Sequence, residues 1–511
     1  MEQALLGSSF SYITVYAAGK RRFFMWLCDF LLRLNARVGD FVWGPIMIGV
    51  FLAEGMWFQA KTAFLPVWKW KLWMRKTILA AFFEKGVHES SDKGALSQFQ
   101  SVCTALAATI GTGNIAGVAT AITAGGPGAV FWMWISAVIG MATTYAENLL
   151  GIKYRYKDRE GHYVGGAMVY MERGCKMKWM AVIFAFLCML SSLGMGNMTQ
   201  VNSVSHALES AFSVPLPVTG IVMAVIIGVL VLGGIGRIAK VTEKLIPIMG
   251  FAFIVGTVMV IGVHFRAIPA AVASIFREAF SFRAGVSGAA GYGIATAMRM
   301  GIARGIFTNE AGLGTSVMVN SVSDVKEPAE QGMWAIFTVF VDTIVMCTLA
   351  ALAILVSGVY DPAVHGAALG TEAFTQLPDG AALTAQAFAS AFGKQGANFV
   401  AISIAVFAFA TLLAWSYYGE KSAEYIWGKK AIPVFKLLFI AATYIGSVMK
   451  LTVVWEISDT FNGLLAIPNL VALAILAPEV AAETRRYMSK KGEISKMTKT
   501  GKAGGKKQQI N

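Results

Sequence analysis

The sequence predicts an all-α integral membrane protein in which two inverted five-helix repeats follow one extra N-terminal helix, giving about eleven transmembrane helices. Three observations lead to this prediction. The composition is strongly apolar, glycine interrupts an apolar segment at the start of each half of the chain, and basic residues gather in alternate connectors.

The composition is that of a membrane protein. Only 14% of the 511 residues are charged and 56% are hydrophobic, whereas a soluble domain carries about 25% charged residues. Apolar runs of about 20 residues, long enough to span a bilayer, recur along most of the chain. The net charge of +14 would fit a nucleic-acid partner, but Lys and Arg lie mostly in short connectors, as the positive-inside rule describes. We therefore expect membrane lipid as a partner and no nucleic acid.

Residues 1–95 are expected to form an N-terminal extension with one transmembrane helix over residues 40–55. Residues 67–85 interleave Trp and Phe with Lys and Arg, which predicts a basic amphipathic helix in the membrane interface. Residues 20–37 are also basic and amphipathic, and their pattern fits either an interfacial helix or part of a further span.

The remaining chain divides into a first five-helix repeat at 96–265, a second at 266–480 and a basic tail at 481–511. Each repeat opens with a glycine-broken helix, although direct sequence similarity between the halves is weak. The spans are expected at residues 98–123, 128–152, 180–210, 216–233, 242–264, 288–319, 331–358, 397–419, 432–450 and 459–478.

Connector charges indicate the orientation of the repeats. If the tail is cytoplasmic, the basic connector 153–178 also falls inside, while the long connector 359–396, with only Lys394, falls outside. Three arginines between 266 and 283 fall outside and are the exception. Because each repeat has an odd number of helices, the two repeats would be inverted relative to each other.

The first interruption lies at residues 108–117, Ala-Thr-Ile-Gly-Thr-Gly-Asn-Ile-Ala-Gly. Glycine weakens a helix, and in lipid each freed backbone group is costly unless something satisfies it. Unwinding here would leave the N–H groups of Thr112 and Gly113 as donors at the start of a half-helix, a ready site for a carboxylate. Broken helices in corresponding halves of a chain point to a secondary transporter.

The same interruption offers ligands for a cation. The carbonyl groups of Ala108, Thr109 and Ile110 would end the preceding half-helix, and with the side-chain oxygen of Asn114 they can bind Na⁺. A tight helix crossing of the small-xxx-small type would also explain the glycines, but it would leave the asparagine without a use.

The second interruption lies at residues 305–314, where Thr308, Asn309 and Glu310 are consecutive polar residues in an apolar span. Thr308 and Asn309 are the candidates for ligand contact. A buried carboxylate needs a partner, so we expect Glu310 to have a structural role, paired with an arginine of the same span or with a bound cation.

Asp342 lies deep in a further span, and an intramembrane acid indicates function by default. It is expected either to bind Na⁺ or to form a structural pair with Arg299 or Arg304, which are also the candidate partners of Glu310. These two acids leave H⁺ coupling open as an alternative.

Two more spans carry polar or bulky residues at helical spacing. Gln200 and Asn197 are three apart and should share a face, which points either to the bundle interior or to helix–helix hydrogen bonds. Thr411 and Trp415 are four apart, which suits a hydroxyl and an indole wall of one pocket. Trp415 would otherwise belong to an interfacial aromatic belt.

Other chemistry finds little support in the sequence. The five cysteines and five histidines show no metal or redox spacing, and the cysteines are expected to act as small apolar residues. There is no phosphate-binding Gly-x-x-x-x-Gly-Lys-[Ser/Thr] loop, and no cleavable signal peptide is visible. We therefore expect no ATP-driven pumping, no organic cofactor and no enzyme activity.

These motifs closely resemble the alanine or glycine:cation symporter family, the sodium:alanine symporters. The resemblance covers residues 97–478. It rests jointly on residues 108–114, 125–134, 140–147, 196–203, 304–314, 415–421 and 459–463.

The resemblance implies a multi-pass carrier in a bacterial or archaeal plasma membrane, with the LeuT-like inverted-repeat fold of amino-acid–sodium symporters. By the same resemblance, Thr112 and Gly113 would hold the substrate carboxylate and Asn114 would hold Na⁺, while Gln200, Thr411 and Trp415 would line the pocket. The expected function is Na⁺-coupled import of alanine, glycine or both by alternating access. The alternatives are serine or glutamine as substrate, H⁺ coupling, or a channel.

Overall fold

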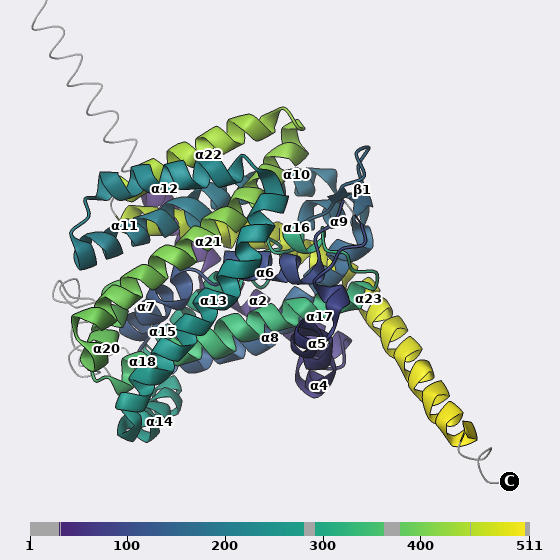
Figure 1. Ribbon diagram of the computed structural model, residues 1–511, viewed down its shortest axis with the longest axis horizontal. Helices are drawn as coiled ribbons and strands as arrows, with labels where there is room; N and C mark the ends of the chain where they lie inside the picture. Colours follow the sequence, from purple (N-terminus) through teal and green to yellow (C-terminus); the bar gives the residue numbers. More distant parts are fainter. Residues whose placement is uncertain are drawn as a thin grey trace, which may run out of the picture.

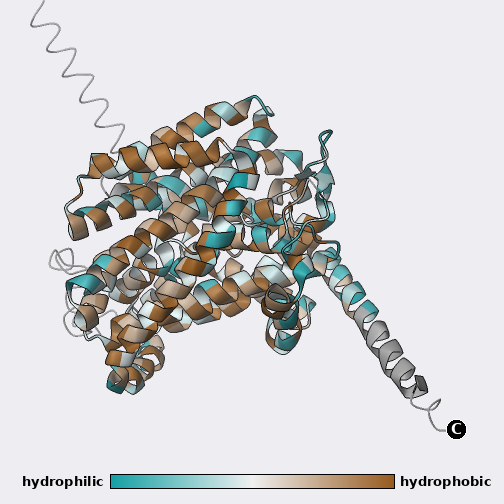
Figure 2. Cartoon of the chain, viewed as in Figure 1, coloured by the Kyte–Doolittle hydropathy of each residue, from teal (hydrophilic) through white to brown (hydrophobic). Residues whose placement is uncertain are grey.

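The computed structural model describes residues 30, 32–92, 94–280, 292–361, 379–449 and 451–505. Almost all of them are helical, and the helices pack into one bundle with a two-stranded hairpin at one end, beside α9 (Figure 1). Apolar residues cover most of the bundle, whereas hydrophilic residues collect around the hairpin and the emerging C-terminal helix (Figure 2).

Eight helices among the described residues are long and apolar enough to cross a membrane. Many of their large apolar side chains, such as Phe251, Ile248 and Leu437, are exposed, which suits a surface in contact with lipid. The eight are Leu32–Lys61, Gly128–Tyr154, Lys178–Phe212, Gly234–Val263, Pro328–Val356, Lys394–Trp427, Ala431–Val448 and Val454–Lys490.

The first half of the chain follows the predicted order of elements. Its third span contains a π-helical turn rather than one regular helix. The elements are α6 (Gln98–Thr109), η3 (Thr112–Asn114), α7 (Ala116–Gly125), α8 (Gly128–Tyr154), β1 (Tyr156–Lys157), β2 (Tyr163–Val164), α9 (Ala167–Arg173), α10 (Lys178–Leu193), η4 (Gly194–Met198), α11 (Thr199–Phe212), α12 (Leu216–Val231) and α13 (Gly234–Val263).

The second half also contains a broken helix and a π-helical segment. Its elements are η5 (Phe265–Ala267), α14 (Ile268–Ala279), α15 (Tyr292–Asn309), α16 (Val317–Asn320), α17 (Pro328–Val339), η6 (Phe340–Cys347), α18 (Thr348–Val356), α20 (Gly380–Phe392), α21 (Lys394–Trp427), α22 (Ala431–Val448) and α23 (Leu451–Gly505).

The N-terminal segment differs from the prediction. The first span is longer than residues 40–55, because helical residues 32–42 precede α2 (Pro45–Lys61) with a short bend between them. The predicted amphipathic helix over 67–85 is instead a series of short turns, α3 (Leu65–Trp68), α4 (Trp70–Met74), η1 (Arg75–Leu79) and α5 (Ala80–Phe83), followed by η2 (Lys85–Val87). Most of the basic segment 20–37 lies outside the described residues.

Three further boundaries differ from the prediction. The connector 359–396 contains α20 in its described part, and the connector 153–178 contains the β1–β2 hairpin, in which Tyr156 pairs with Val164. The last span does not end at residue 478, because α23 continues through the expected boundary at 480. A solvated basic sequence can thus prolong a transmembrane helix, since Lys and Arg are good helix formers.

The centre of the bundle is α8, which packs against α15 and α17. Glycines permit this approach: a Cβ atom added at Gly301 would lie 2.2 Å from the Ala129 carbonyl oxygen, and one at Gly332 would lie 2.5 Å from Tyr145 Cδ2. Close contact through small residues is how helices associate in lipid. The broken helices α6/α7 and α15/α16 are both held against this centre, which brings the two interruptions together.

Candidate functional site

The broken helices are anchored together at the hairpin end. Ser97 caps α6, accepting a bond from the Gln100 N–H at 3.1 Å while Gln100 Oε1 accepts from the Ser97 N–H at 3.3 Å. Just before this cap, the Leu96 N–H donates to the Val322 carbonyl at 2.9 Å, and the Leu96 carbonyl accepts from the Asp324 N–H at 2.8 Å. The start of α6 is therefore tied to the segment that follows α16.

The first interruption is a true break between two helices. Helix α6 ends at Thr109, Ile110 leaves the helical region with φ −75° and ψ 86°, and Gly111 is extended with φ −130° and ψ −151°. A short 3₁₀ turn leads to α7, which begins at Ala116. Unwinding at the predicted place is confirmed, and Ala108, Thr109 and Ile110, the three predicted carbonyl ligands, are buried.

Gln200 occupies one of the two N–H donors that were expected to meet a carboxylate, that of Thr112. Its Oε1 accepts from the Thr112 N–H at 3.3 Å and from the Thr112 hydroxyl at 3.0 Å. Thr411 lies beside Gln200, since a Cβ added at Gly111 would lie 2.7 Å from Thr411 Oγ1 and 3.2 Å from Gln200 Oε1. The Thr411 hydroxyl donates to the Ala107 carbonyl at 2.9 Å. A polar oxygen thus already sits where a substrate carboxylate would bind.

Asn114 links the first break to the π-helix η6. Its Nδ2 donates to Asp342 Oδ1 at 2.7 Å and to the Asp342 carbonyl at 3.2 Å, and its Oδ1 accepts from the Gly111 N–H at 3.0 Å. Thr343 donates to the other carboxylate oxygen of Asp342 at 2.8 Å. Asn114 Nδ2 also lies 3.4 Å from Cys347 Sγ, so this cysteine belongs to a polar cluster and not to a purely apolar core.

The expectation that Arg299 or Arg304 pairs with Glu310 or Asp342 is wrong. Arg304 pairs with Asp459 at 2.7 Å and Arg299 pairs with Asp40 at 3.0 Å. Asp342 is instead held by the amide and hydroxyl groups described above.

The second interruption begins at Glu310, directly after Asn309, the last residue of α15. Glu310, Gly312 and Gly314 have positive φ values of 57°, 81° and 71°, so the chain turns sharply before α16. The left-handed conformation of Glu310, a non-glycine residue, is held by two bonds to its carboxylate. Thr315 donates to Oε2 at 2.5 Å, and Trp415 Nε1 donates to Oε1 at 3.0 Å.

Trp415 is fully buried, so its assignment to an interfacial belt is wrong. It packs directly against η4, where a Cβ added at Gly196 would lie 2.4 Å from Trp415 Cγ. Its indole therefore joins the third span to the second break through Glu310.

Thr308 and Asn309 take different positions around the breaks. Thr308 packs against the first break, since a Cβ added at Gly113 would lie 2.6 Å from Thr308 Cγ2. Asn309 faces η6, where its Nδ2 donates to the Thr343 hydroxyl at 3.1 Å, and its Oδ1 accepts from the Ala311 N–H at 3.0 Å.

Twelve residues were predicted for the substrate and ion sites, and the structure brings them into one neighbourhood around the breaks. In a regular helix Asn197 would share a face with Gln200, but the structure differs. Asn197 donates to the Phe439 carbonyl of α22 at 2.7 Å, whereas Gln200 faces Thr112. Asn197 belongs to the π-helical turn Gly194–Met198, whereas Gln200 lies in α11, which follows it, so regular helical spacing does not apply between them.

A cavity of about 430 Å³ reaches Ala116, just after the first break. The helices α7, α11 and α20 around it lie at the end of the bundle away from the hairpin (Figure 1). The cavity is lined by α7, α11, α20 and α21, and Ala116 and Thr120 of α7 form part of its wall. Trp455 and Arg304 lie at its edge. A second cavity, of about 760 Å³, lies at the hairpin end and is lined by Arg155, Lys157 and Asp324 among others.

An ion pair and two stacked rings separate the cavity beside α7 from the break. Phe307 and Trp455 stack with centroids 5.3 Å apart, and the guanidinium of Arg304 lies 5.4 Å and 5.5 Å from their centroids. Phe307 also adjoins Gly113, where an added Cβ would lie 3.4 Å from its Cδ1. We call the Arg304–Asp459 pair and the rings of Phe307 and Trp455 the cover of the first break. The sequence analysis did not predict it, although Arg304 and Asp459 inside apolar spans were a usable signal.

A third group of polar residues supports the second break. Glu147 Oε1 accepts from the Gly314 N–H at 3.0 Å and from Asn469 Nδ2 at 2.6 Å, and Asn469 Nδ2 also donates to the Gly312 carbonyl at 3.0 Å. Glu147 was not among the predicted site residues, yet an acid within an apolar span was again the available signal.

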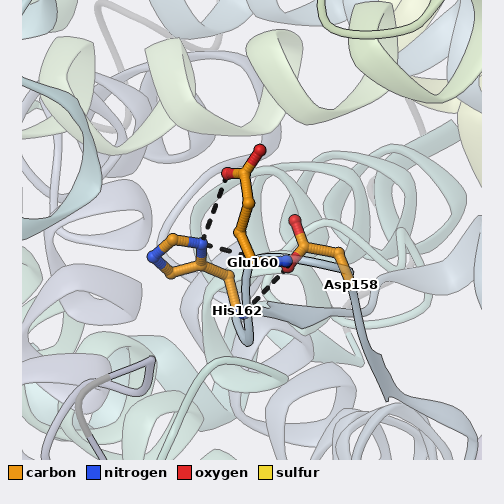
Figure 3. Close-up of side chains that lie close together, drawn as sticks. All are labelled: Asp158, Glu160 and His162. Carbon is orange, nitrogen blue, oxygen red and sulfur yellow. Dashed lines mark hydrogen bonds and ion pairs between the residues drawn. The ribbon is translucent and has the colours of Figure 1, made fainter.

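Metal-capable side chains also meet on the hairpin, although sequence spacing indicated no such group. Ligand atoms of Asp158, Glu160 and His162 lie within 4.8 Å of one another (Figure 3). Lys429 pairs with Glu160 at 2.6 Å and with Asp158 at 3.4 Å. Hydrogen bonding from the backbone N–H of His162 lowers the pKa of Asp158. These bonds explain the cluster as a stabilised turn.

Comparison with known proteins identifies the family of the chain. The model of the sodium:alanine symporter family matches residues 29–501. The sodium/alanine symporter AgcS of Methanococcus maripaludis is 40% identical over 465 residues, which cover 90% of this chain and 97% of AgcS. The protein named "Probable sodium/glutamine symporter GlnT" of Bacillus subtilis is 35% identical over 453 residues, covering 88% of this chain and 90% of GlnT.

Among solved structures, that of MhsT in complex with L-phenylalanine superposes with a TM-score of 0.52 at 14% identity, covering 77% of this chain and 99% of MhsT. At this identity the likeness shows the fold alone. The family model and AgcS, by contrast, show that the chain is a transporter and not an enzyme. The chain is a multi-pass membrane protein that belongs to the sodium:alanine symporter family.

Proposed function

We propose that this protein is a Na⁺-coupled symporter that imports alanine, glycine or both by alternating access. The observation that carries the proposal is the bond between Asn114 and Asp342, which joins the first helix break to η6 inside a buried polar cluster. Intramembrane polar groups are expensive and persist where they bind ions or substrate.

The proposed Na⁺ site consists of the carbonyl groups of Ala108, Thr109 and Ile110 with the side chains of Asn114 and Asp342. Carboxylate, amide and carbonyl oxygens are the donors that hard cations prefer. Asn114 now donates to the acid and turns its oxygen toward Gly111. Rotation of this amide would present its oxygen to an ion lying beside the carboxylate.

The proposed substrate site consists of Thr112, Gly113, Gln200, Thr308, Asn309, Thr411 and Trp415. The carboxylate of the amino acid would replace Gln200 Oε1 at the Thr112 N–H, which is already oriented toward an oxygen acceptor. Buried Trp415 would limit the side chain to a small group. Serine or glutamine remains the alternative substrate, and the glutamine name of GlnT favours testing it.

We further propose the inverted five-plus-five repeat with eleven transmembrane helices, the repeats at 96–265 and 266–480, and a cytoplasmic tail at 481–511. Supporting this count, the shorter apolar helix α12 and the two broken helices α6/α7 and α15/α16 add three spans to the eight long apolar helices. The basic hairpin end would then face the cytoplasm, and the cavity beside α7 would face outward.

Energetics permit strong accumulation by this mechanism. One Na⁺ moving inward through ~100 mV contributes ~2.3 kcal/mol, and a tenfold Na⁺ gradient adds ~1.4 kcal/mol. A zwitterionic substrate adds no net charge. Together these terms support accumulation of roughly several hundredfold, at ~1.4 kcal/mol for each factor of ten.

The test is uptake of radiolabelled alanine into proteoliposomes under an inward Na⁺ gradient, with a matched K⁺ gradient as control. We expect concentrative uptake only with Na⁺, and competition by glycine. Competition by serine or glutamine, and uptake driven by an H⁺ gradient, would identify the alternatives. Uptake that never exceeds the external concentration would indicate a channel, and no uptake of either amino acid would refute the substrate assignment.

A further inference from the structure

The short helical turns between α2 and α6 leave large apolar side chains exposed beside the bundle. Phe82 and Phe83 of α5 are 79% and 81% exposed, and Trp68 of α3 is 75% exposed. We call residues 65–85, which contain α3, α4, η1 and α5, the lateral segment. Its helices α4 and α5 project from the bundle next to α17 (Figure 1). An exposed apolar patch of this kind marks a surface that binds another molecule or the membrane.

The lateral segment is also basic. It contains five Lys or Arg residues and one acid, Glu84. Lys76 pairs with Glu330 of α17 at 2.7 Å. The other four basic side chains are exposed and form no ion pair with the described part of the chain, and they are Lys69, Lys71, Arg75 and Lys85. A ligand that covers this surface is therefore expected to carry negative charge.

Buried and exposed side chains alternate at helical spacing along the segment. Trp73 and Thr77, four apart, are buried against the bundle. Arg75, Leu79 and Phe82, which are four and three apart, are exposed. The outward face thus combines a cation with apolar groups. Segments with this pattern lie in the plane of the membrane interface, with their rings at the acyl boundary and their cations among the headgroups.

Two neighbouring helices show the depth of the segment in the membrane. The span that contains α2 ends at Lys61, just before the segment, and α17 begins at Pro328 and carries Glu330 in its first turn. The bond between Lys76 and Glu330 therefore holds the segment level with the ends of two spans. This is the depth of the headgroups, where aromatic rings and Lys or Arg gather. A deeper position would bury four cations in hydrocarbon at a high cost.

Charge also distinguishes a lipid surface from a second copy of this chain. A symmetric dimer brings the same patch of both copies together, which would place four unpaired cations opposite four others. An anionic bilayer instead offers phosphate groups to the cations and acyl chains to the rings. We propose that the lateral segment binds the headgroups of anionic phospholipids, and that this binding is linked to η6.

The link to η6 is a contact between two rings. The centroid of the buried Trp73 ring lies 5.5 Å from that of Phe340, and Trp73 Nε1 donates to the Pro66 carbonyl at 2.9 Å. Phe340 is the first residue of η6, two positions before Asp342. Asp342 in turn accepts from Asn114 at the first break. Lipid that restrains the segment therefore restrains the helix that carries Asp342.

The direct test is quenching of tryptophan fluorescence by brominated lipids in the full-length protein. Vesicles of phosphatidylethanolamine contain either brominated phosphatidylglycerol, which is anionic, or brominated phosphatidylethanolamine at the same mole fraction. The difference between the wild type and Trp68→Phe/Trp70→Phe isolates the signal of the segment. We expect stronger quenching by the anionic lipid, and a weaker preference at high salt.

Replacing the four unpaired cations by Gln should abolish the preference for the anionic lipid. Each single change, such as Lys69→Gln or Arg75→Gln, should lower the relative affinity for that lipid about fivefold. Lys394→Gln is the matched control, because it removes an exposed cation at the start of α21, next to α20 and far from α4 (Figure 1). This control should keep the wild-type preference.

Three results would overturn the proposal. Equal quenching of the wild-type signal by the two lipids would show that the surface does not recognise headgroup charge. An unchanged preference in the variant without the four cations would assign that preference to other basic residues. Quenching by neither lipid would place the segment outside the membrane interface, and a cross-link between copies through the segment would then assign the patch to a dimer contact.

Transport tests the link to η6, and this readout rests on the proposed function. We expect phosphatidylglycerol to lower the Na⁺ concentration for half-maximal alanine uptake in the wild type. Phe340→Leu removes the ring contact but no charge, so it should lose this shift and keep the quenching preference. A shift that persists in Phe340→Leu would contradict the link. If the wild type transports no alanine, the proposed function fails, while quenching still tests the lipid site.

Discussion

Asn114 donates to Asp342 across the gap between the first helix break and η6, with 2.7 Å between Nδ2 and Oδ1. These residues are 228 positions apart in the chain. The bond uses the amide nitrogen, whereas a cation would need the amide oxygen. Binding of Na⁺ is therefore expected to replace this direct bond with an ion bridge between the two side chains.

The variant Asp342→Asn tests this relationship. It keeps the shape and a hydrogen bond to Asn114 but removes the negative charge next to the proposed ion. A bond to a charged group contributes about 1.5–3 kcal/mol, so the Na⁺ concentration for half-maximal uptake should rise at least about tenfold. Asp40→Asn, which removes an exposed acid paired with Arg299, is the control. Unchanged Na⁺ affinity and stoichiometry would exclude Asp342 as a ligand.

The variant Gln200→Glu tests the carboxylate site. A carboxylate at position 200 would accept the Thr112 bonds more strongly than the amide and would repel the substrate carboxylate. Alanine affinity measured by equilibrium binding should fall by at least about tenfold, because charge-assisted bonds are roughly twice as strong as neutral ones. Gln200→Met removes the acceptor without adding charge, and we expect it to bind alanine better than Gln200→Glu does. Equal affinity in the two variants would argue against a carboxylate at Thr112.

The sequence was sufficient to predict the class of fold and the position of the first break. Apolar length and connector charge depend only on local composition, and Gly111 and Gly113 mark where the helix unwinds. The sequence also indicated that Asn114 and Asp342 matter, because polar residues in apolar spans stand out. What it could not give was their mutual contact, which depends on how distant helices pack.

The wrong expectations share one cause. Arg299 and Arg304 were candidate partners of Glu310 and Asp342, yet they pair with Asp40 and Asp459, which lie on other helices. Asn197 was placed by regular helical spacing, which the π-helical turn changes. Tertiary partners and local irregularities in a helix are not encoded in the hydrophobic pattern of a single segment.

The variant Trp415→Phe should relax the choice of substrate. It removes the indole N–H that donates to Glu310 and opens space next to Gly196. The unpartnered oxygen of Glu310 costs about 1–3 kcal/mol, so alanine affinity should fall about tenfold, while glutamine should compete better than in the wild type. Trp334→Phe is the matched control, since that buried indole bonds to Gln98 away from the breaks. An unaltered order of competing amino acids would show that Trp415 does not limit substrate size.

The hairpin contact of Asp92 with Lys157 should depend on pH. The bond from Lys157 at 2.5 Å lowers the pKa of Asp92. A carboxyl group with a lowered pKa in the folded state stabilises the contact above its unfolded pKa of about 3.9, and the contact weakens as the pH falls through the folded value. Hydrogen exchange of the β1–β2 amides should thus lose protection in acid. Lys157→Gln should abolish this pH dependence, and a dependence that persists would exclude the pair as its cause.

The pair of Arg304 and Asp459 should control exchange between the breaks and the cavity lined by α7, α11, α20 and α21. Both side chains are mostly buried, 16% and 18% exposed, and the guanidinium also contacts the stacked rings of Phe307 and Trp455. Asp459→Asn leaves the rings in place but removes the charge, so a loss of about 1.5–3 kcal/mol would shift the cover toward its open state. Efflux of preloaded alanine from proteoliposomes should then accelerate at least about tenfold. Asp40→Asn is again the control, because its ion pair with Arg299 does not border the cavity wall. Efflux at the wild-type rate in Asp459→Asn would mean that the rings of Phe307 and Trp455 alone close the route.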